Sequence, residues 1–275
     1  LRKRRKGTGE AMALLEVNGI TKVFGGLKAV SEVSFEVEEG EIVSIIGPNG
    51  AGKTTVYNML TGVYKVDGGT VVFEGKEIQN HQPRQIVQAG IARTFQNIRL
   101  FPNMRVIENV LIGEHVNIHY NFWNLLFKTP KYRREEKAAA ERAIALLESL
   151  GLGDEIDNYA QNLPYGMQRK LEIARALATK AKLIILDEPA AGMNPQESEE
   201  LMEFIRELRK SGVTILMIEH DMNVVMNISD RIYVIDHGRK IAEGLPAEIA
   251  KNPEVVKAYL GSGGAAECSR RKCSK

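Results

Sequence analysis

Cysteine and long apolar runs are both scarce in this chain of 275 residues. Its two cysteines, Cys268 and Cys273, lie in the last ten residues, where they provide neither a disulfide framework nor a zinc site and fit a reducing compartment. No apolar run approaches the roughly 18 residues that cross a bilayer, and the longest runs, 42–46 and 183–186, have the length of buried strands. We therefore expect that the chain does not itself cross a membrane.

An excess of charge of one sign is also missing, because the net charge is +2 at pH 7. Nine basic residues lie at the two ends, and residues 7–266 carry 28 bases and 34 acids, a net charge of −6. A nucleic-acid groove needs clustered bases on a folded face, so we expect no nucleic-acid partner. The N-terminal bases lack the apolar segment of a secretory signal. We interpret residues 1–12 as a disordered basic tail, or as a start site placed before the true beginning at Met12, and residues 261–275 as a polar tail.

The pattern of apolar and polar residues predicts one α/β domain over residues 13–260. Residues 14–46 alternate in polarity between glycine breaks, which predicts short strands, and further strands are predicted over 70–73 and 91–95. A helical signal follows from about 105 to 179 and is strongest over 133–150. It predicts a helical subdomain inserted at about 97–180.

Strands and helices alternate again past residue 180. Strands are predicted over 183–186, 213–218 and 232–235, and helices over 195–210 and 222–228. Such alternation is typical of a mainly parallel sheet with helices on both faces.

The strongest single signal follows the apolar strand 42–46. The chain there matches G-x-x-x-x-G-K-[ST] and then enters a helical pattern, with the residues Gly47, Pro48, Asn49, Gly50, Ala51, Gly52, Lys53 and Thr54. Glycines let backbone N–H groups surround an anion, and the helix N-terminus adds its positive end. We expect Lys53 to reach the β- and γ-phosphates of ATP and the Thr54 hydroxyl to bind Mg²⁺. A chance match has odds of roughly one in a hundred, and the flanking strand and helix lower them further.

Two carboxylates, Asp187 and Glu188, end a second apolar strand. The carboxyl ends of parallel strands form the edge at which such sheets bind ligands. We expect Asp187 in the Mg²⁺ shell, and Glu188, on the opposite side, to accept a proton from the attacking water or to orient it. A strand that ends in Asp-Glu is a weak signal alone and a strong one beside the phosphate loop.

These motifs, together with residues 163–169, resemble an ABC ATPase over about residues 14–260. The segment that aligns with the family's L-S-G-G-Q signature and the residue after it is Leu163, Pro164, Tyr165, Gly166, Met167 and Gln168. The resemblance implies a P-loop NTPase core with a mainly parallel sheet, an antiparallel β subdomain and the inserted helical subdomain. It also implies an ATP-hydrolysing, head-to-tail dimer in which each MgATP lies between one subunit's phosphate loop and the other's signature.

Further positions match this family one by one. Phe24 falls where an aromatic ring stacks on adenine, and Thr55 extends the nucleotide contacts of the phosphate loop. Gln96 matches the Q-loop glutamine, which touches the Mg²⁺ and water region and couples to the membrane partner. His220 matches the switch histidine that contacts the γ-phosphate. The resemblance thus implies Glu188, His220 and Gln96 as catalytic residues, and Thr54, Gln96 and Asp187 as the metal site.

Several residues depart from the family pattern. Pro164, Tyr165 and Met167 replace the Ser, the first Gly and the Gln of the signature, and Asn194 replaces the usual Asp of the D-loop. Pro164 has neither a hydroxyl nor a backbone N–H, so the donor that Ser supplies to the γ-phosphate is missing. If a partner ATPase has an intact signature, we expect the two ATP sites to differ.

The variant motifs at 163–166, 187–195 and 218–222 resemble the LivG-like ATP-binding subunits of branched-chain amino-acid importers. This resemblance implies two transmembrane permeases, a second ABC ATPase subunit and an extracytoplasmic substrate-binding protein as partners. It also implies a cytoplasmic chain that is peripheral on the inner face of the membrane. Because the substrate touches other subunits, importers of other amino acids, amides or urea remain alternatives.

Two other functions are less favoured by the sequence. A non-transport ABC ATPase would need a long coiled-coil insertion, two ATPase modules or a basic face, and none is seen. A regulatory module without turnover is disfavoured because Lys53, Glu188 and His220 are all present. The aromatic-rich segment 121–127 is expected to pack within the helical subdomain, with a contact surface for a membrane subunit as the alternative.

Overall fold

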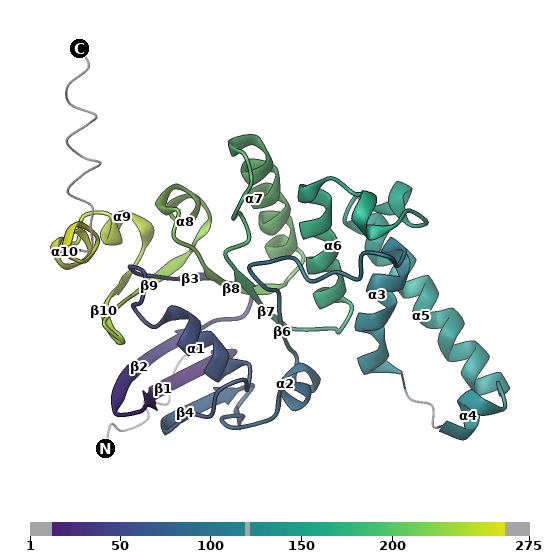
Figure 1. The fold of residues 1–275 in the computed structure, drawn as a ribbon, viewed down its shortest axis with the longest axis horizontal. Helices are drawn as coiled ribbons and strands as arrows, with labels where there is room; N and C mark the ends of the chain where they lie inside the picture. The colour runs from purple at the N-terminus through teal and green to yellow at the C-terminus, as the bar shows by residue number, and fades with distance from the viewer. Residues whose placement is uncertain (1–12, 119–121, 262–275) are drawn as a thin grey trace, which may run out of the picture.

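The computed structural model describes residues 13–118 and 122–261, so the two predicted tails lie outside the described residues except for Gly261. Two sheets form its centre (Figure 1). The larger has six strands in the order β10-β9-β3-β8-β7-β6, and the smaller has four in the order β2-β1-β4-β5. Helices cover the larger sheet, and a group of helices extends from one end of it.

The larger sheet is mainly parallel, as the sequence predicts. Its parallel strands are β3 (Ile42–Ile46), β6 (Ile91–Arg93), β7 (Leu183–Asp187), β8 (Thr214–Ile218) and β9 (Arg231–Asp236). Every residue of β3, β7 and β8 is buried, which fits their continuous apolar sequences. The antiparallel edge strand β10 (Arg239–Gly244) was not predicted, since it carries alternating charge and no apolar run.

The smaller sheet is the antiparallel β subdomain. It consists of β1 (Leu15–Phe24), β2 (Leu27–Val37), β4 (Gly68–Phe73) and the two-residue β5 (Lys76–Glu77). Helix α1 (Lys53–Leu60) lies between the two sheets (Figure 1). One hydrophobic core joins apolar residues of both sheets to α1, so the helix that follows the phosphate loop is fixed from two sides.

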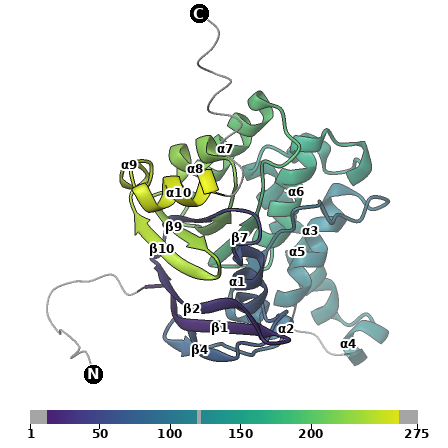
Figure 2. The same cartoon turned by 60° about the vertical axis from the view of Figure 1, so that its left-hand side comes forward.

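Helices on the opposite face complete the α/β layers. Helix α7 (Pro195–Lys210) packs on β7 and β8, while α8 (Met222–Ile228), α9 (Pro246–Ile249) and α10 (Pro253–Gly261) gather beside β9 and β10 (Figure 2). The predicted helices 195–210 and 222–228 have the bounds of α7 and α8. The short helices α2 (Pro83–Ala89), α9 and α10 were not predicted.

The remaining helices form the group at the end of the large sheet. They are α3 (Val106–Glu114), α4 (Phe122–Leu126), α5 (Pro130–Ser149) and α6 (Tyr165–Leu177), with 3-10 turns at His115–Asn117, Gly153–Glu155 and Ala160–Asn162. Residues of α3, α5 and α6 share their own hydrophobic core. Helix α5 begins earlier than the predicted 133, because the Thr129 hydroxyl accepts a hydrogen bond from the Tyr132 N–H and Pro130 occupies the first turn.

The expectation that the aromatic segment packs within the helical subdomain is wrong for its described side chains. Trp123 and Phe127 are 62% and 70% exposed, and Leu125 and Leu126 are exposed as well. Helix α4 is only five residues long and lies at the far end of α5, away from the core of α3 and α6 (Figure 1). The rings of Trp123 and Phe127 stack on each other with centroids 6.1 Å apart.

Within residues 13–118 and 122–261, no helix combines the length and the apolar character that crossing a bilayer requires.

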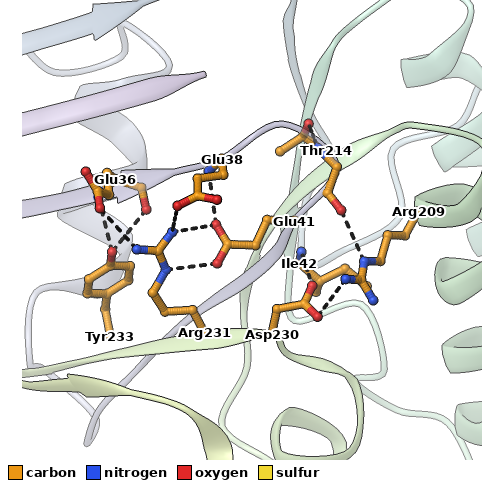
Figure 3. A network of polar contacts seen from close by, with 10 residues as sticks. Glu36, Glu38, Glu41, Ile42, Arg209, Thr214, Asp230, Arg231 and Tyr233 are labelled. Atoms are coloured by element: carbon orange, nitrogen blue, oxygen red, sulfur yellow. Dashed lines mark hydrogen bonds and ion pairs between the residues drawn. The ribbon is translucent and has the colours of Figure 1, made fainter. Parts of the chain in front are cut away.

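A cluster of ion pairs fastens the antiparallel sheet to the parallel one (Figure 3). The Arg231 guanidinium on β9 donates from Nε and one terminal nitrogen to the two carboxylate oxygens of Glu41, both at 2.8 Å, and reaches Glu36 on β2 at 3.1 Å. The hydroxyl of Tyr233 donates to the Glu36 carbonyl at 3.1 Å, and burial raises the pKa of Tyr233 to about 12. The hydrogen bonds with Glu41 raise the pKa of Arg231 above its ordinary value.

We expect Arg231→Met to lower the free energy of unfolding by about 2–3 kcal/mol, because the mostly buried Glu41 carboxylate would lose its charged, two-point donor. The matched control is Arg206→Met on the surface of α7, whose pairs with Glu199 and Glu203 are exposed and should contribute less than about 1 kcal/mol. Urea unfolding followed by circular dichroism compares the two. Equal, small losses in both variants would contradict the role given to Arg231.

Candidate functional site

The predicted site residues follow the carboxyl ends of four parallel strands and lie at one edge of the large sheet. The phosphate loop follows β3, Gln96 lies three residues after β6, Glu188 follows β7, and His220 lies two residues after β8. Since these strands are parallel, their carboxyl ends lie side by side. Segments that are far apart in the sequence therefore meet at this edge.

The phosphate loop has a backbone that only glycine accommodates at two positions. Gly47 has a φ of 153°, and a Cβ there would lie 1.9 Å from the Ile235 carbonyl oxygen. Gly52 has a φ of 103°, and its Cβ would lie 2.6 Å from the Ala29 carbonyl oxygen. The loop thus packs directly on the backbone of β2 and β9, with α1 beginning at Lys53.

Lys53 lies inside this loop. Its Nζ donates hydrogen bonds to the carbonyl oxygens of Gly47 at 2.6 Å and Pro48 at 3.0 Å. Burial lowers the pKa of Lys53, and the nearby negative charge of Glu188 opposes that shift. The loop therefore holds one buried cation among backbone groups, which is the electrostatic character of a phosphate site.

A pocket of about 480 Å³ opens over the loop, a volume that a nucleotide fits. Its lining includes Asn49, Gly50, Ala51, Gly52, Lys53, Thr54 and Thr55, together with Glu188. The rest comes from residues that the sequence did not single out: Leu27, Lys28, Ala29, His237 and Gly238. They come from β2 and from the turn between β9 and β10, and no motif marks either segment.

Phe24 is not among the residues that line this pocket. It ends β1, its ring packs edge-on against Tyr64 with centroids 5.2 Å apart, and Lys22 Nζ lies 5.4 Å from its centroid. The ring is 42% exposed. On the side of the antiparallel sheet, the structure brings Leu27 and Ala29 to the pocket rather than Phe24.

Glu188, Gln96 and His220 meet beside the pocket. Gln96 Nε2 donates to Glu188 Oε2 at 2.6 Å, and His220 Nδ1 lies 3.4 Å from the same oxygen. Glu188 has a φ of 46°, a left-handed backbone that costs a residue with a side chain roughly 1–3 kcal/mol. The Glu188 N–H is held by the carbonyl of Ile218 on β8 at 3.0 Å. The fold thus maintains a strained backbone that turns this carboxylate toward the phosphate loop.

Asp187 is buried one residue earlier, and its Oδ2 accepts a hydrogen bond from Arg93 at 2.7 Å. Arg93 also donates to Asn58 on α1 at 2.7 Å, so it links the ends of β6 and β7 to the helix after the phosphate loop. Sequence reasoning missed Arg93, because an arginine at a strand end reads as an ordinary surface charge. Burial raises the pKa of the neighbouring Tyr57, and the negative charge of Asp187 adds to the shift.

The donor set suits Mg²⁺. A carboxylate and a hydroxyl oxygen, from Asp187 and Thr54, are hard ligands of the kind that Mg²⁺ prefers, and this ion commonly takes one or two protein ligands and completes its shell with phosphate and water. Among the described residues there is no group of three or more His, Cys, Asp or Glu that could hold a metal ion alone.

Glu219 is a second residue that the motifs did not identify. Its buried carboxylate accepts hydrogen bonds from the backbone N–H groups of Ala190 at 3.2 Å, His220 at 3.0 Å and Asp221 at 3.4 Å. Burial raises the pKa of Glu219, while these hydrogen bonds act in the opposite direction. The side chain thus joins the loop that carries His220 to the loop after Glu188.

The six residues that align with the family signature lie apart from this pocket, and none of them lines it. Pro164 is the N-cap of α6 and makes no side-chain cap. The Tyr165 hydroxyl donates to the Ala191 carbonyl at 3.0 Å, and Gln168 Nε2 donates to the Leu163 carbonyl at 2.8 Å. Asn194 caps α7, where its side chain accepts from the Glu197 N–H.

Comparison with known proteins agrees with this geometry. A family model described as "ABC transporter" matches residues 30–191, and one described as "Branched-chain amino acid ATP-binding cassette transporter" matches residues 239–265. The chain is 52% identical to the high-affinity branched-chain amino acid transport ATP-binding protein LivG of Salmonella typhimurium, over 90% of this chain and 98% of that one. It is 50% identical to BraF of Pseudomonas aeruginosa, which carries the same description, over the same shares.

Solved structures are similar over the same length. An ATP-binding cassette of an ABC transporter in its ADP conformation superposes with a TM-score of 0.80 and 39% identity, covering 91% of this chain and 99% of that one. The cbiO1 subunit of the Clostridium perfringens transporter complex cbiONQ gives 0.74 and 26%, covering 92% and 96%. The chain therefore belongs to the ABC transporter family, as one of its ATP-hydrolysing subunits.

Proposed function

We propose that this chain drives uptake of branched-chain amino acids as the ATPase subunit of an importer, bound to the inner face of the cell membrane. Its partners would be two transmembrane permeases, a second ATPase subunit and, indirectly, an extracytoplasmic substrate-binding protein. The proposed ATP hydrolysis is supported above all by one observation: Gln96 and His220 converge on Glu188 beside the phosphate loop. The substrate class is supported by the descriptions of the Salmonella and Pseudomonas relatives and by the match at residues 239–265.

We propose the following roles at the ATP site. The phosphates would lie on the backbone N–H groups of the phosphate loop, with Lys53 as the cation of that cradle. Thr54 and Asp187 would hold Mg²⁺, with Gln96 at its edge. Bound Mg²⁺ supplies neutralisation of the charge that develops on the phosphate oxygens. Arg93, which bonds Oδ2 of Asp187, would leave Oδ1 for the metal.

Glu188 would take a proton from the attacking water or orient that water. The contacts found for its carboxylate among the described residues involve Oε2, where Gln96 and His220 converge. Oε1 is thus the oxygen available to the water. In this arrangement Gln96 fixes the rotation of the carboxylate, and His220 approaches the same oxygen.

The position of the signature supports a site shared by two subunits. Because residues 163–168 do not line the pocket of their own chain, they are available to a nucleotide held by another subunit. The exposed side chains of Trp123, Leu125, Leu126 and Phe127 support a further contact, with a permease, since an apolar group of this size is unusual on a surface without a partner.

Glu188→Gln tests the proposed reaction. The amide cannot accept a proton from water but keeps the shape of the side chain, so MgATP should still bind while hydrolysis falls by about 10²–10⁴-fold. The expected product is a long-lived, ATP-bound dimer, detected by gel filtration with labelled ATP. Glu199→Gln, an exposed carboxylate on α7, is the control and should hydrolyse ATP normally. Full hydrolysis by Glu188→Gln would place the base elsewhere.

The site completed by Pro164 should be the slower of the two in a complex whose partner ATPase has serine in its signature. Pro164 supplies no donor, and the Tyr165 hydroxyl is engaged with Ala191 of its own chain. Because a hydrogen bond to a charged group contributes about 1.5–3 kcal/mol, Pro164→Ser should accelerate the partner's site and leave this chain's own site unchanged.

Single-turnover rates measure this difference when Glu188 and the partner's corresponding glutamate are disabled one at a time. Pro164→Ala is the matched control, since it restores the backbone N–H without the hydroxyl and should give a smaller gain. Equal rates at both sites, unmoved by Pro164→Ser, would exclude the asymmetry.

A further inference from the structure

The helix that carries the signature, α6, has one ion pair whose two side chains are completely buried. On α6, the side chains of Arg169 and Glu172 are 0% and 1% exposed, and their N–O distance is 2.8 Å. Removing two charges from water costs several kcal/mol per ion, and an apolar pair of the same size would often be as stable. The energetic benefit of this pair therefore depends on the other groups that it contacts.

Those groups are the backbone of residues 95–99, the segment that carries Gln96. Arg169 donates to the carbonyl oxygens of Phe95 and Gln96, each at 2.7 Å. Glu172 Oε1 accepts from the Arg99 N–H at 3.1 Å. The pair thus fixes the segment at its beginning and at its end, and it uses charged hydrogen bonds, which are the strong ones.

The backbone hydrogen bonds between the sheet and this part of the chain end just before the segment 95–99. The last backbone hydrogen bond to β7 is donated by Thr94 to Ile185 at 2.9 Å. Among the described residues, no backbone hydrogen bond from residues 95–99 to the sheet follows it. The guanidinium groups of Arg99 and Arg93 lie over the ring of Phe95, 4.4 Å and 5.3 Å from its centroid. From Phe95 on, the segment is held mainly by α6.

We infer that Arg169, with Glu172, is a positioning residue that fastens Gln96 to the signature helix and thereby couples the two ATP sites of a dimer. Gln96 contacts Glu188 in its own chain, at 2.6 Å, whereas α6 begins with signature residues that would face the other subunit's nucleotide. If contact with the other subunit's nucleotide shifts α6 relative to the sheet, Gln96 moves relative to Glu188. This inference rests on the shared site of the proposed function.

Two variants separate positioning from simple loss of folding. Arg169→Lys keeps the charge beside Glu172, but a single ammonium lacks the fork that reaches both carbonyl oxygens. The double variant Arg169→Met with Glu172→Gln removes both charges, so that no unpaired charge stays buried. The control is Lys170→Met, which removes the next positive charge along α6. Lys170 lies over the Phe204 ring, 5.3 Å from its centroid, and the hydrogen bonds found among the described residues between α6 and residues 95–99 come from Arg169 and Glu172 instead.

The first measurement is hydrogen exchange of the full chain, compared peptide by peptide. Both test variants should exchange the amides of residues 95–99 about tenfold faster or more, while β3, β7 and the rest of α6 keep the wild-type rates. Lys170→Met should leave all of them unchanged. Wild-type exchange at 95–99, or an increase spread evenly over α6 and the sheet, would overturn the inference.

The second measurement separates kcat from nucleotide affinity in the complex assembled with its partner subunits. A displaced Gln96 should lower kcat by about 10–100-fold, because small errors in catalytic geometry are that costly. The Kd for ATP should stay near the wild-type value, since the phosphate loop is untouched, and the dependence of one site's rate on the other's occupancy should be lost. Unchanged kcat and coupling would overturn the inference. A wild-type complex that bound ATP and released no phosphate would instead contradict the proposed function, and the exchange experiment would still decide whether Arg169 holds the segment.

Discussion

The parallel register of four strands is the constraint on which the rest of this structure depends. Ile45 of β3 pairs with Ile218 of β8, and Ile218 pairs with Asp187 of β7, so these residues lie at one level of the sheet. The phosphate loop, Glu188 and His220 all leave the sheet just beyond that level. Because side chains alternate between faces, a slip of one residue would turn Asp187 or Glu188 to the wrong side. The buried apolar strands fix this register, and the chemistry at their ends follows from it.

Strain is concentrated at the same edge. Glu188 adopts a left-handed backbone, and Gly47 packs so closely on Ile235 that no side chain could fit. Local preferences are broken at the edge where the proposed catalytic residues lie, and the surrounding sheet and ion pairs supply the stability that maintains this geometry. Arg231 and Glu41 perform this task on one side of the site, by holding the antiparallel sheet against the parallel one. Glu219 performs it on the other, through three backbone N–H groups.

The sequence predicted the parallel core, and it placed the candidate site residues that local motifs mark at the ends of its strands. Lys53, Asp187, Glu188 and His220 each follow a recognisable strand. The missed residues acquire their importance from tertiary contacts: Arg93 reads as a surface charge at a strand end, and Arg169 as one of many charges on a polar helix. Likewise, the hairpin geometry that brings Leu27 to the pocket and leaves Phe24 outside is not encoded in any short pattern. The exposed α4 could not be predicted either, because an aromatic-rich helix looks the same whether it packs inward or faces a partner.

We propose that each chain contributes to two ATP sites, with its phosphate loop in one site and its signature in the other. The most direct measurement is the rate of phosphate release per subunit, for the isolated chain over a range of concentrations and for the chain assembled with its permeases and the second ATPase. We expect a very low rate for the dilute chain and a large increase on assembly. A full rate from a dilute chain that sedimentation shows to be monomeric would contradict it.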